Sequence, residues 1–167
     1  MAIIKCLLVF IFNGSDYTVM AWVYLRACNY YSRLIDVGNG KSSDNIVFSV
    51  SAGTTCLPNN LNLIGGNQVF SVRSQSKLQL NKWQHLSFTF CASKIAYVYI
   101  NGLLTGNETA TIGVPKNIMR QTNFVGRSNF LSSGDGDVNA ILDEIKIFHK
   151  SLSQKEIQFE MNNELFF

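Results

Sequence analysis

The sequence is dominated by an alternation of apolar and polar residues with a period of two, which recurs along most of its length. Residues 46–51 (IVFSVS), 70–73 (FSVR) and 85–90 (HLSFTF) all follow it. Because successive side chains of a β-strand point to opposite faces of a sheet, this period predicts strands that bury one face and leave the other in water. Residues 95–100 (IAYVYI) are apolar at both parities, which predicts a strand inside a sheet.

Turn-forming residues separate the predicted strands. Asn101-Gly102 directly follows a strand and favours a type I′ hairpin, because both residues of such a turn adopt positive φ. Only the tail predicts a helix, where Ser153 and Glu156 have the spacing of a capping box. The apolar stripe of that helix consists of Ile157, Met161 and Leu165. Together these signals predict an all-β fold, a two-sheet antiparallel sandwich with one short C-terminal helix.

The composition bounds the class of protein. A chain of 167 residues fits one domain, and a hydrophobic content of 47% supplies enough apolar surface for a compact core. The net charge is +3 without any basic run, so nothing indicates nucleic-acid binding. The cysteines form no C-x-x-C pair, which argues against a zinc site and leaves two disulfides possible. They are Cys6, Cys28, Cys56 and Cys91.

The first twelve residues admit two interpretations. Residues 1–12 are either a first strand, ended by the turn at Asn13-Gly14, or a vestigial signal segment, and the domain proper is expected at 13–167. The apolar part is shorter than a membrane span, so we predict no membrane insertion. Asn13 and Asn107 begin N-x-S/T sequons that could carry glycans in a secreted chain, although such tripeptides also arise by chance.

Three segments resemble one known family, in that family's order. Residues 17–25 (YTVMAWVYL) are similar to its early strand, and residues 81–89 (NKWQHLSFT) with 97–102 (YVYING) are similar to its W-x-H strand and Y-V-N-G hairpin. Residues 142–148 (LDEIKIF) and 151–157 (SLSQKEI) resemble its closing D-E-x-x-I strand and short helix. The family is the laminin-G-like group of the concanavalin A-like lectin and glucanase superfamily, and the resemblance spans most of the chain.

This resemblance implies a jelly-roll sandwich that acts as an extracellular recognition module in processes such as cell adhesion. We expect a secreted single module, or part of a larger multidomain protein, that binds a glycan or an extracellular protein through loops at the sandwich rim. A degenerate glycoside hydrolase-like domain and a structural spacer remain as alternatives, because one scaffold serves all three roles. The N-terminus departs from the family, since residues 12–15 (FNGS) run almost directly into Tyr17.

No catalytic arrangement is recognisable in the sequence. Glycoside hydrolysis requires two carboxylates about 5–9.5 Å apart. The acidic strand offers Asp143 but no second acid on the same face. His85 and His149 are the only histidines, and neither G-x-S-x-G nor H-E-x-x-H occurs. We predict that the chain is not an enzyme and that its site has no catalytic residue.

Asp143 is the most informative acid for a metal site. Alternation places it on the parity of the three isoleucines of its strand, toward the core, where a carboxylate needs a partner. One candidate is Arg127. The other is calcium, an optional cofactor that several laminin-G-like relatives hold at a sheet rim, bound by Asp143 with Asp135 or Asp137. The loop 134–139 (GDGDVN) also fits a plain solvated turn.

A second polar loop, residues 36–45 (DVGNGKSSDN), could present groups to a ligand. Lectin sites combine Asp and Asn groups with an aromatic platform, and two tyrosines precede this loop. The candidate ligand-binding residues are Tyr30, Tyr31, Asp36, Asn39, Asp44 and Asn45. Ordinary turn chemistry explains the same residues. Cys28 and Cys56 flank the loop, so a disulfide could close it in an oxidising compartment, with Cys91 left as a free thiol.

Overall fold

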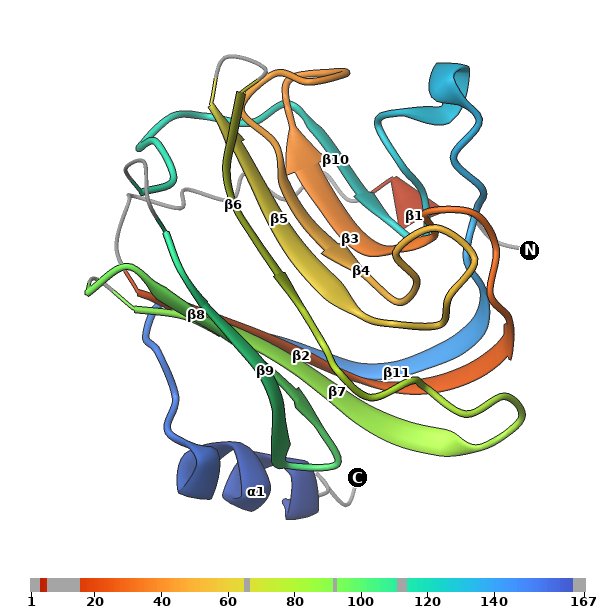
Figure 1. The fold of residues 1–167 in the computed structure, drawn as a ribbon, viewed down its shortest axis with the longest axis vertical. Coiled ribbons are helices and arrows are strands. Elements are labelled where there is room, and N and C mark those ends of the chain that lie inside the picture. The colour runs from red at the N-terminus through yellow and green to blue at the C-terminus, as the bar shows by residue number, and fades with distance from the viewer. Residues whose placement is uncertain (1–3, 6–15, 65–66, 92, 111–113, 164–167) are drawn as a thin grey trace.

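The computed structural model describes residues 4–5, 16–64, 67–91, 93–110 and 114–163. Two antiparallel sheets pack face to face, and one helix lies against the outer face of the second sheet (Figure 1). Sheet A has the strand order β1-β10-β3-β4-β5-β6, and sheet B has the order β11-β2-β7-β8-β9. The predicted sandwich with one C-terminal helix is confirmed.

The elements have the following bounds. Sheet A contains β1 (Ile4–Lys5), β3 (Arg33–Gly38), β4 (Ile46–Ser49), β5 (Asn59–Ile64), β6 (Asn67–Arg73) and β10 (Thr122–Val125). Sheet B contains β2 (Tyr17–Ala27), β7 (Trp83–Phe90), β8 (Ile95–Ile100), β9 (Leu103–Thr109) and β11 (Asn139–Phe148). A 3-10 turn, η1 (Leu131–Ser133), and the helix α1 (Gln154–Asn162) complete the set.

The core lies between the sheets and is built from the alternating apolar residues of both. Tyr17 of sheet B stacks on Phe90 at 5.5 Å between ring centroids and meets Phe48 of sheet A edge-on at 5.7 Å. Phe70 of sheet A stacks on Phe90 at 5.0 Å. Rings contributed by both sheets therefore form one continuous aromatic cluster, and burial of this apolar surface holds the layers together.

The hairpin turn and the helix cap predicted from short sequence motifs are both present in the structure. Asn101 and Gly102 have φ values of 51° and 69° and connect β8 to β9, as a type I′ hairpin requires. Ser153 is the N-cap of α1 and forms the capping box with Glu156. Ile157 is the buried residue of that helix.

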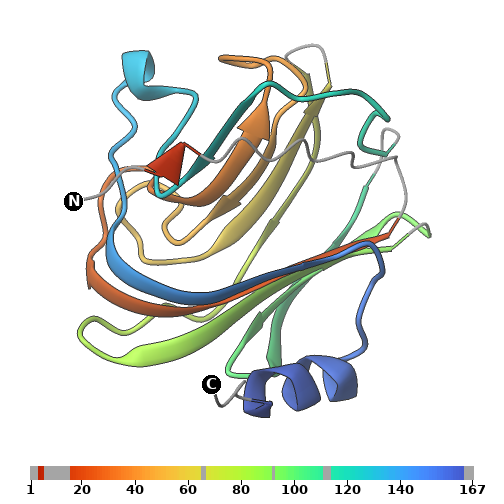
Figure 2. The same cartoon turned by 180° about the vertical axis from the view of Figure 1, so that it is seen from behind.

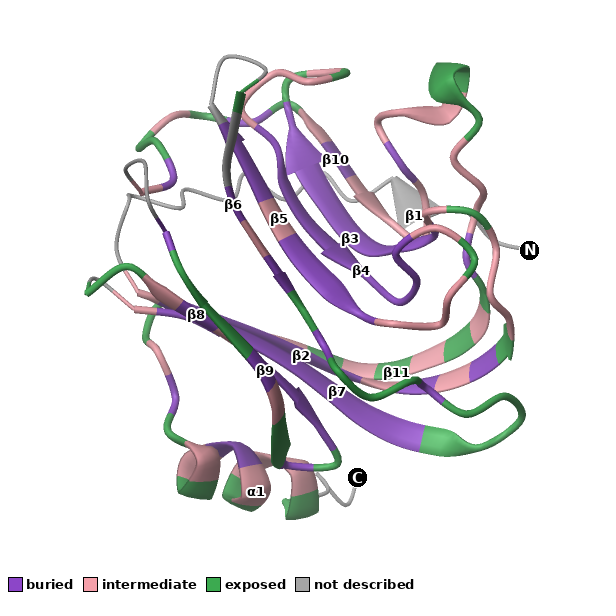
Figure 3. Cartoon of the chain, viewed as in Figure 1, coloured by how far each residue is buried: buried purple, intermediate pink, exposed green. Residues whose placement is uncertain are grey.

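The expectation of strands with one wet face is wrong for β4 and β7, whose outward side chains are also buried (Figure 3). In sheet B, α1 and the preceding segment cover part of the outer face, where Leu152 and Ile157 pack on Met20 and Tyr99. In sheet A, the segment between β10 and β11 supplies hydrogen bonds to Asp36, on the face of β3 away from the core. The period-two alternation of a strand does not reveal that its outer face is covered, because the covering segments are distant in sequence.

The predicted disulfide between Cys28 and Cys56 is present. Cys91 is half-buried and has no disulfide partner among the described residues. At the N-terminus, Ile4–Lys5 pair with β10, whereas Asn13 and the rest of 1–12 lie outside the described residues. No described helix has the length and apolar character to cross a membrane.

The orientation predicted for Asp143 is wrong, because the three isoleucines of its strand do not share one face: Ile141 and Ile145 are exposed, whereas Ile147, beyond a β-bulge, packs on the core. The register of β11 against β2 shifts between Asp143 and Lys146, and Glu144 in this interval has a φ of 45°. Ala140, Leu142 and Ile147 pack on the core instead. Asp143 therefore points outward and is exposed, together with Ile141 and Ile145, and β11 shows alternating bands of burial (Figure 3).

Candidate functional site

Three loops meet at the end of the sandwich where β2 ends and β3 begins. The Cys28–Cys56 disulfide joins the loop before β3 to the loop after β4. The backbone N–H of Tyr31 donates to the carbonyl oxygen of Gly53 at 3.0 Å, and that of Gly136 donates to the carbonyl of Tyr30 at 2.7 Å. These links fix the three loops to one another.

The side chains gathered there form a site that we call the tyrosine rim, defined as Tyr30, Tyr31, Arg33, Phe130 and Asp135. Tyr30 is 49% exposed and meets Tyr31 in a T-shaped contact at 4.7 Å. The guanidinium carbon of Arg33 lies 5.5 Å from the ring centroid of Tyr31 and 5.9 Å from that of Phe130. An aromatic surface is therefore held around a buried cation, an arrangement in which the quadrupole of each ring favours the charge.

The charge of Arg33 is balanced inside the rim. Its Nη2 lies 2.8 Å from Oδ2 of Asp135, and both side chains are almost fully buried. Nη1 donates to Oγ of Ser49 at 2.6 Å, and Oγ of Ser128 donates to the same Asp135 oxygen at 2.7 Å. Arg33 consequently acts as a rigid support for the two rings, and its charge is already neutralised before any ligand arrives.

The backbone of Tyr31 is held in a strained conformation. Its φ is 44°, a left-handed value that is uncommon for a bulky residue and that costs free energy unless the surroundings enforce it. Strained backbone of this kind clusters at binding sites, because the fold holds a side chain where a relaxed chain would not place it. The tyrosine rim is thus preorganised at its aromatic residues.

Asp36 lies on the outward face of β3 in a closed polar network. Its Oδ1 accepts hydrogen bonds from Nδ2 of Asn45 at 3.1 Å and Nδ2 of Asn129 at 2.8 Å, and its Oδ2 accepts one from the backbone N–H of Asn129 at 2.9 Å. Burial raises the pKa of Asp36, and the donors from Asn129 and Asn45 oppose that rise. Asp36 and Asn45 are fully buried, so they support the loops from beneath.

Asn39 and Asp44 lie at the other end of β3 and do not join the tyrosines. Nδ2 of Asn39 donates to the carbonyl of Met119 at 3.0 Å, and Oδ1 of Asp44 pairs with Nζ of Lys116 at 2.9 Å. Both residues therefore fasten their loop to the segment before β10. A strand of six residues separates them from Tyr31, about 20 Å at the usual rise per residue. The six predicted ligand residues do not form one site.

The residues predicted for calcium are not gathered by the described part of the chain, where no three acidic, histidine or cysteine side chains converge on a metal-sized space. Asp143 is exposed on the outer face of sheet B, and Asp135 is paired with Arg33. Asp137 lies in the rim loop, where its carbonyl accepts a bond from Asn29 at 2.8 Å and its Oδ1 is buried without a partner among these residues.

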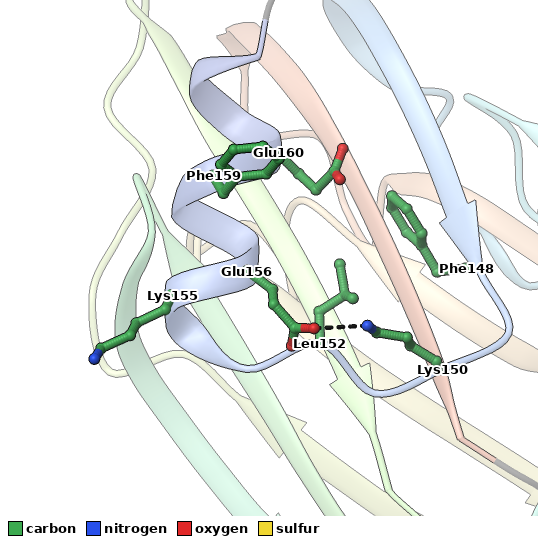
Figure 4. Close-up of a pocket in the computed structure, with 7 residues that line it drawn as sticks. All are labelled: Phe148, Lys150, Leu152, Lys155, Glu156, Phe159 and Glu160. Carbon is green, nitrogen blue, oxygen red and sulfur yellow. Dashed lines mark hydrogen bonds and ion pairs between the residues drawn. The ribbon is translucent and has the colours of Figure 1, made fainter.

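A shallow groove of about 430 Å³ runs between α1 and the end of β11 (Figure 4). Phe148, Leu152 and Phe159 form its apolar wall, and Nζ of Lys150 pairs with Oε1 of Glu156 at 2.6 Å. Hydrogen bonds from Lys150 and Ser153 lower the pKa of Glu156 to about 2. Ion pairs and the capping box already use Lys150, Glu156 and Glu160, so this groove is a weaker candidate than the tyrosine rim.

Two acids beside β11 are already held in ion pairs. Glu144 and Glu160 both lie 3.6 Å from Nζ of Lys146, so each carboxylate is paired with the same ammonium group. His85 is 2% exposed beneath Trp22, with ring centroids 5.3 Å apart. Burial, and secondarily the charge of Lys146, lowers the pKa of His85 to about 4, so its imidazole is neutral at pH 7.

Two curved antiparallel sheets with a short closing helix and loops gathered at one rim define a jelly-roll β-sandwich (Figure 2). Comparison with protein families makes the class more specific. A laminin G family model, described as the concanavalin A-like lectin/glucanases superfamily, matches residues 7–158. The chain therefore belongs to this laminin-G-like family. No protein among those curated individually matches it.

Solved structures share the fold at low sequence identity. A heptameric SAP-like pentraxin from Limulus polyphemus is 12% identical with a TM-score of 0.62, covering 86% of this chain and 68% of its own. The binding domain of Paraclostridial Mosquitocidal Protein 1 is 17% identical with a TM-score of 0.61, covering 89% and 37%. A structure of botulinum neurotoxin type C, whose cell entry depends on two ganglioside molecules, is 14% identical with a TM-score of 0.61, covering 89% and 35%. The chain thus spans little more than a third of the two toxin structures.

Part of this site is predictable from the sequence. Tyr30, Tyr31 and Asp135 were identifiable from the loops they occupy, although Asp135 serves Arg33 in the structure. Arg33 and Phe130 carried no sequence signal of their own, because a single Arg at a strand start and a single Phe in a loop are ordinary. Their roles follow only from contacts between segments about a hundred residues apart.

Proposed function

We propose that this chain is a non-catalytic recognition module that binds a glycan through the tyrosine rim. The observation that carries the proposal is the half-exposed ring of Tyr30, held on a frame of fixed loops and a neutralised Arg33. Sugar rings present a C–H face that packs on an aromatic ring, and preorganised rings lose little entropy on binding. The fold it shares with a ganglioside-dependent toxin domain supports the same ligand class.

The proposed setting is secreted or extracellular, within a larger protein or alone. The Cys28–Cys56 disulfide supports this, because disulfides persist in oxidising compartments. Asn107 is exposed in β9 and could carry a glycan in that compartment. Calcium bound by Asp137 and Asp135 in the rim loop is a separate part of the proposal. Asp143 lies on β11, outside that loop, and is not included.

A glycan-array screen of the oxidised domain, with calcium and with a chelator, tests the proposal. We expect wild type to bind a defined subset of glycans, Tyr30→Ala to lose those that bind at the rim, and Phe159→Ala to retain them all. Phe159 is the matched control because it is an aromatic residue, 64% exposed, on α1 rather than in the rim. Signals lost on chelation would support calcium. An empty array under both conditions, or loss only in Phe159→Ala, would contradict a glycan site at the rim.

A further inference from the structure

The outer face of sheet B is divided into two halves. The half near the start of β2 lies against α1, and the half where β2 ends and β7 begins has no described element over it (Figure 1). Two cross-strand rows lie on that open half. Ile141 of β11, Tyr24 of β2 and Trp83 of β7 are register partners in one row. Asp143, Trp22 and His85 are partners in the next.

We call the open half the sheet-B platform, defined as Trp22, Tyr24, Trp83, Ile141 and Asp143. Trp83 is 45% exposed and Ile141 is 42% exposed. Tyr24 meets Trp83 at 5.7 Å between centroids, and Trp22 rests on His85 at 5.3 Å. The rings support one another, so the platform is fixed before any ligand binds.

β11 places a carboxylate beside these rings. Asp143 is the last regularly paired residue before the bulge, and it points outward because its neighbour Leu142 packs on the core. Oδ1 of Asp143 accepts a hydrogen bond from the backbone N–H of Glu144 at 2.8 Å, which orients the group. Its other oxygen has no partner among the described residues and can accept a bond from a ligand. Nearby Lys146 is already paired with Glu144 and Glu160.

The size of the platform favours a small ligand over a protein surface. The exposed parts of Trp83 and Ile141, together with those of the neighbouring Ile145, amount to roughly 250 Å², whereas a specific protein interface needs about 800 Å² from each partner. Two rings and one carboxylate acceptor match the needs of a sugar, whose C–H face packs on a ring while a hydroxyl donates to an acid. Asp143 and the exposed Arg26 of β2 carry opposite charges on this outer face, so together they favour neither acidic nor basic sugars.

From this geometry we propose that the sheet-B platform is a second binding site, for a neutral oligosaccharide. One pyranose ring packs on Trp83 and Tyr24, and one hydroxyl donates to Asp143. The site is on a sheet face and uses none of the rim residues, so it does not depend on the function proposed for the tyrosine rim.

Tryptophan fluorescence gives a direct test, because the chain contains two tryptophans and both belong to the platform. We would titrate the domain with neutral gluco-, manno-, xylo- and galacto-oligosaccharides and run affinity electrophoresis in the matching polysaccharides. At least one ligand is expected to shift the emission and retard the protein. Trp83→Ala should weaken that retardation about tenfold and Asp143→Asn several-fold, with native circular dichroism.

Two controls separate this site from the rim. Leu103→Ala changes a residue that is 60% exposed in β9 of the same sheet, and Tyr30→Ala changes the rim. Both should bind the platform ligand as wild type does. The proposal is overturned if no neutral saccharide shifts the emission, if Trp83→Ala binds unchanged, or if the fluorescence depends on protein concentration, which would make a second copy the occupant. Loss in Tyr30→Ala alone would assign the ligand to the rim.

Discussion

At the scale of single residues, Asp36 shows how a buried carboxylate is tolerated in this fold. Three N–H donors, from Asn45 and Asn129, converge on its two oxygens. Asp36→Asn would turn an NH2 group toward one set of these donors, so we expect a loss of about 1–3 kcal/mol in the free energy of unfolding, measured by urea denaturation. Asp143→Asn, at an exposed position, should change it by less than about 0.5 kcal/mol. Equal effects of the two substitutions would contradict this account.

The lowered pKa of His85 predicts how the stability of the protein depends on pH. Its pKa is about 4 in the folded protein against 6.5 when unfolded, so the unfolded state binds the extra proton between these values. The stability contribution is complete above pH 6.5 and is lost as pH falls toward 4, by up to roughly 3 kcal/mol. Urea unfolding of wild type and His85→Gln from pH 7 to 4 checks this. A wild-type curve no steeper than that of the variant would exclude His85 as the cause.

At the scale of elements, the Cys28–Cys56 disulfide controls the rim loops. It closes a segment with a sequence separation of 28, for which loss of chain entropy in the unfolded state predicts about 3–4 kcal/mol of stabilisation. We expect the double substitution Cys28→Ala with Cys56→Ala to lower the thermal midpoint and to weaken glycan binding at the rim, read by calorimetry and by the array. Cys91→Ser should change neither, since Cys91 lies outside these loops. A rim that binds unchanged without the disulfide would show that the hydrogen bonds suffice.

The elements also show which features a sequence can predict. The Asn101-Gly102 hairpin and the Ser153 cap were predictable because their geometry depends on a few adjacent residues. The bulge in β11 was not, since Glu144 gives no hint of its positive φ and one extra residue reverses every later side chain. Asp143 was assigned to the core because it shares a parity with Ile147, which lies beyond the bulge, and the sheet-B platform was invisible in the alternation pattern. The tyrosine rim was found only in part, because its supports come from distant loops.

At the scale of the whole molecule, the two sheets and the helix depend on two separate apolar clusters. The larger lies between the sheets, and the smaller joins α1 to the outer face of sheet B through Met20, Tyr99, Leu152 and Ile157. Because Met20 belongs to the same strand as core residues Val19 and Ala21, any loosening of the outer cluster acts directly on the main core. We infer that helix and sandwich unfold as one cooperative unit.

Ile157→Ala tests this coupling. Ile157 is fully buried, so the truncation leaves a cavity and should cost about 2–5 kcal/mol in the free energy of unfolding. The transition followed by tryptophan fluorescence, which reports on β2 and β7, should coincide with that followed by far-ultraviolet circular dichroism, which reports on the whole chain. Phe159→Ala, on the same helix but 64% exposed, should leave both midpoints nearly unchanged. Two separated transitions in Ile157→Ala would mean that α1 detaches before the sandwich unfolds, and the helix would then be an appendage of the fold instead of part of its cooperative core.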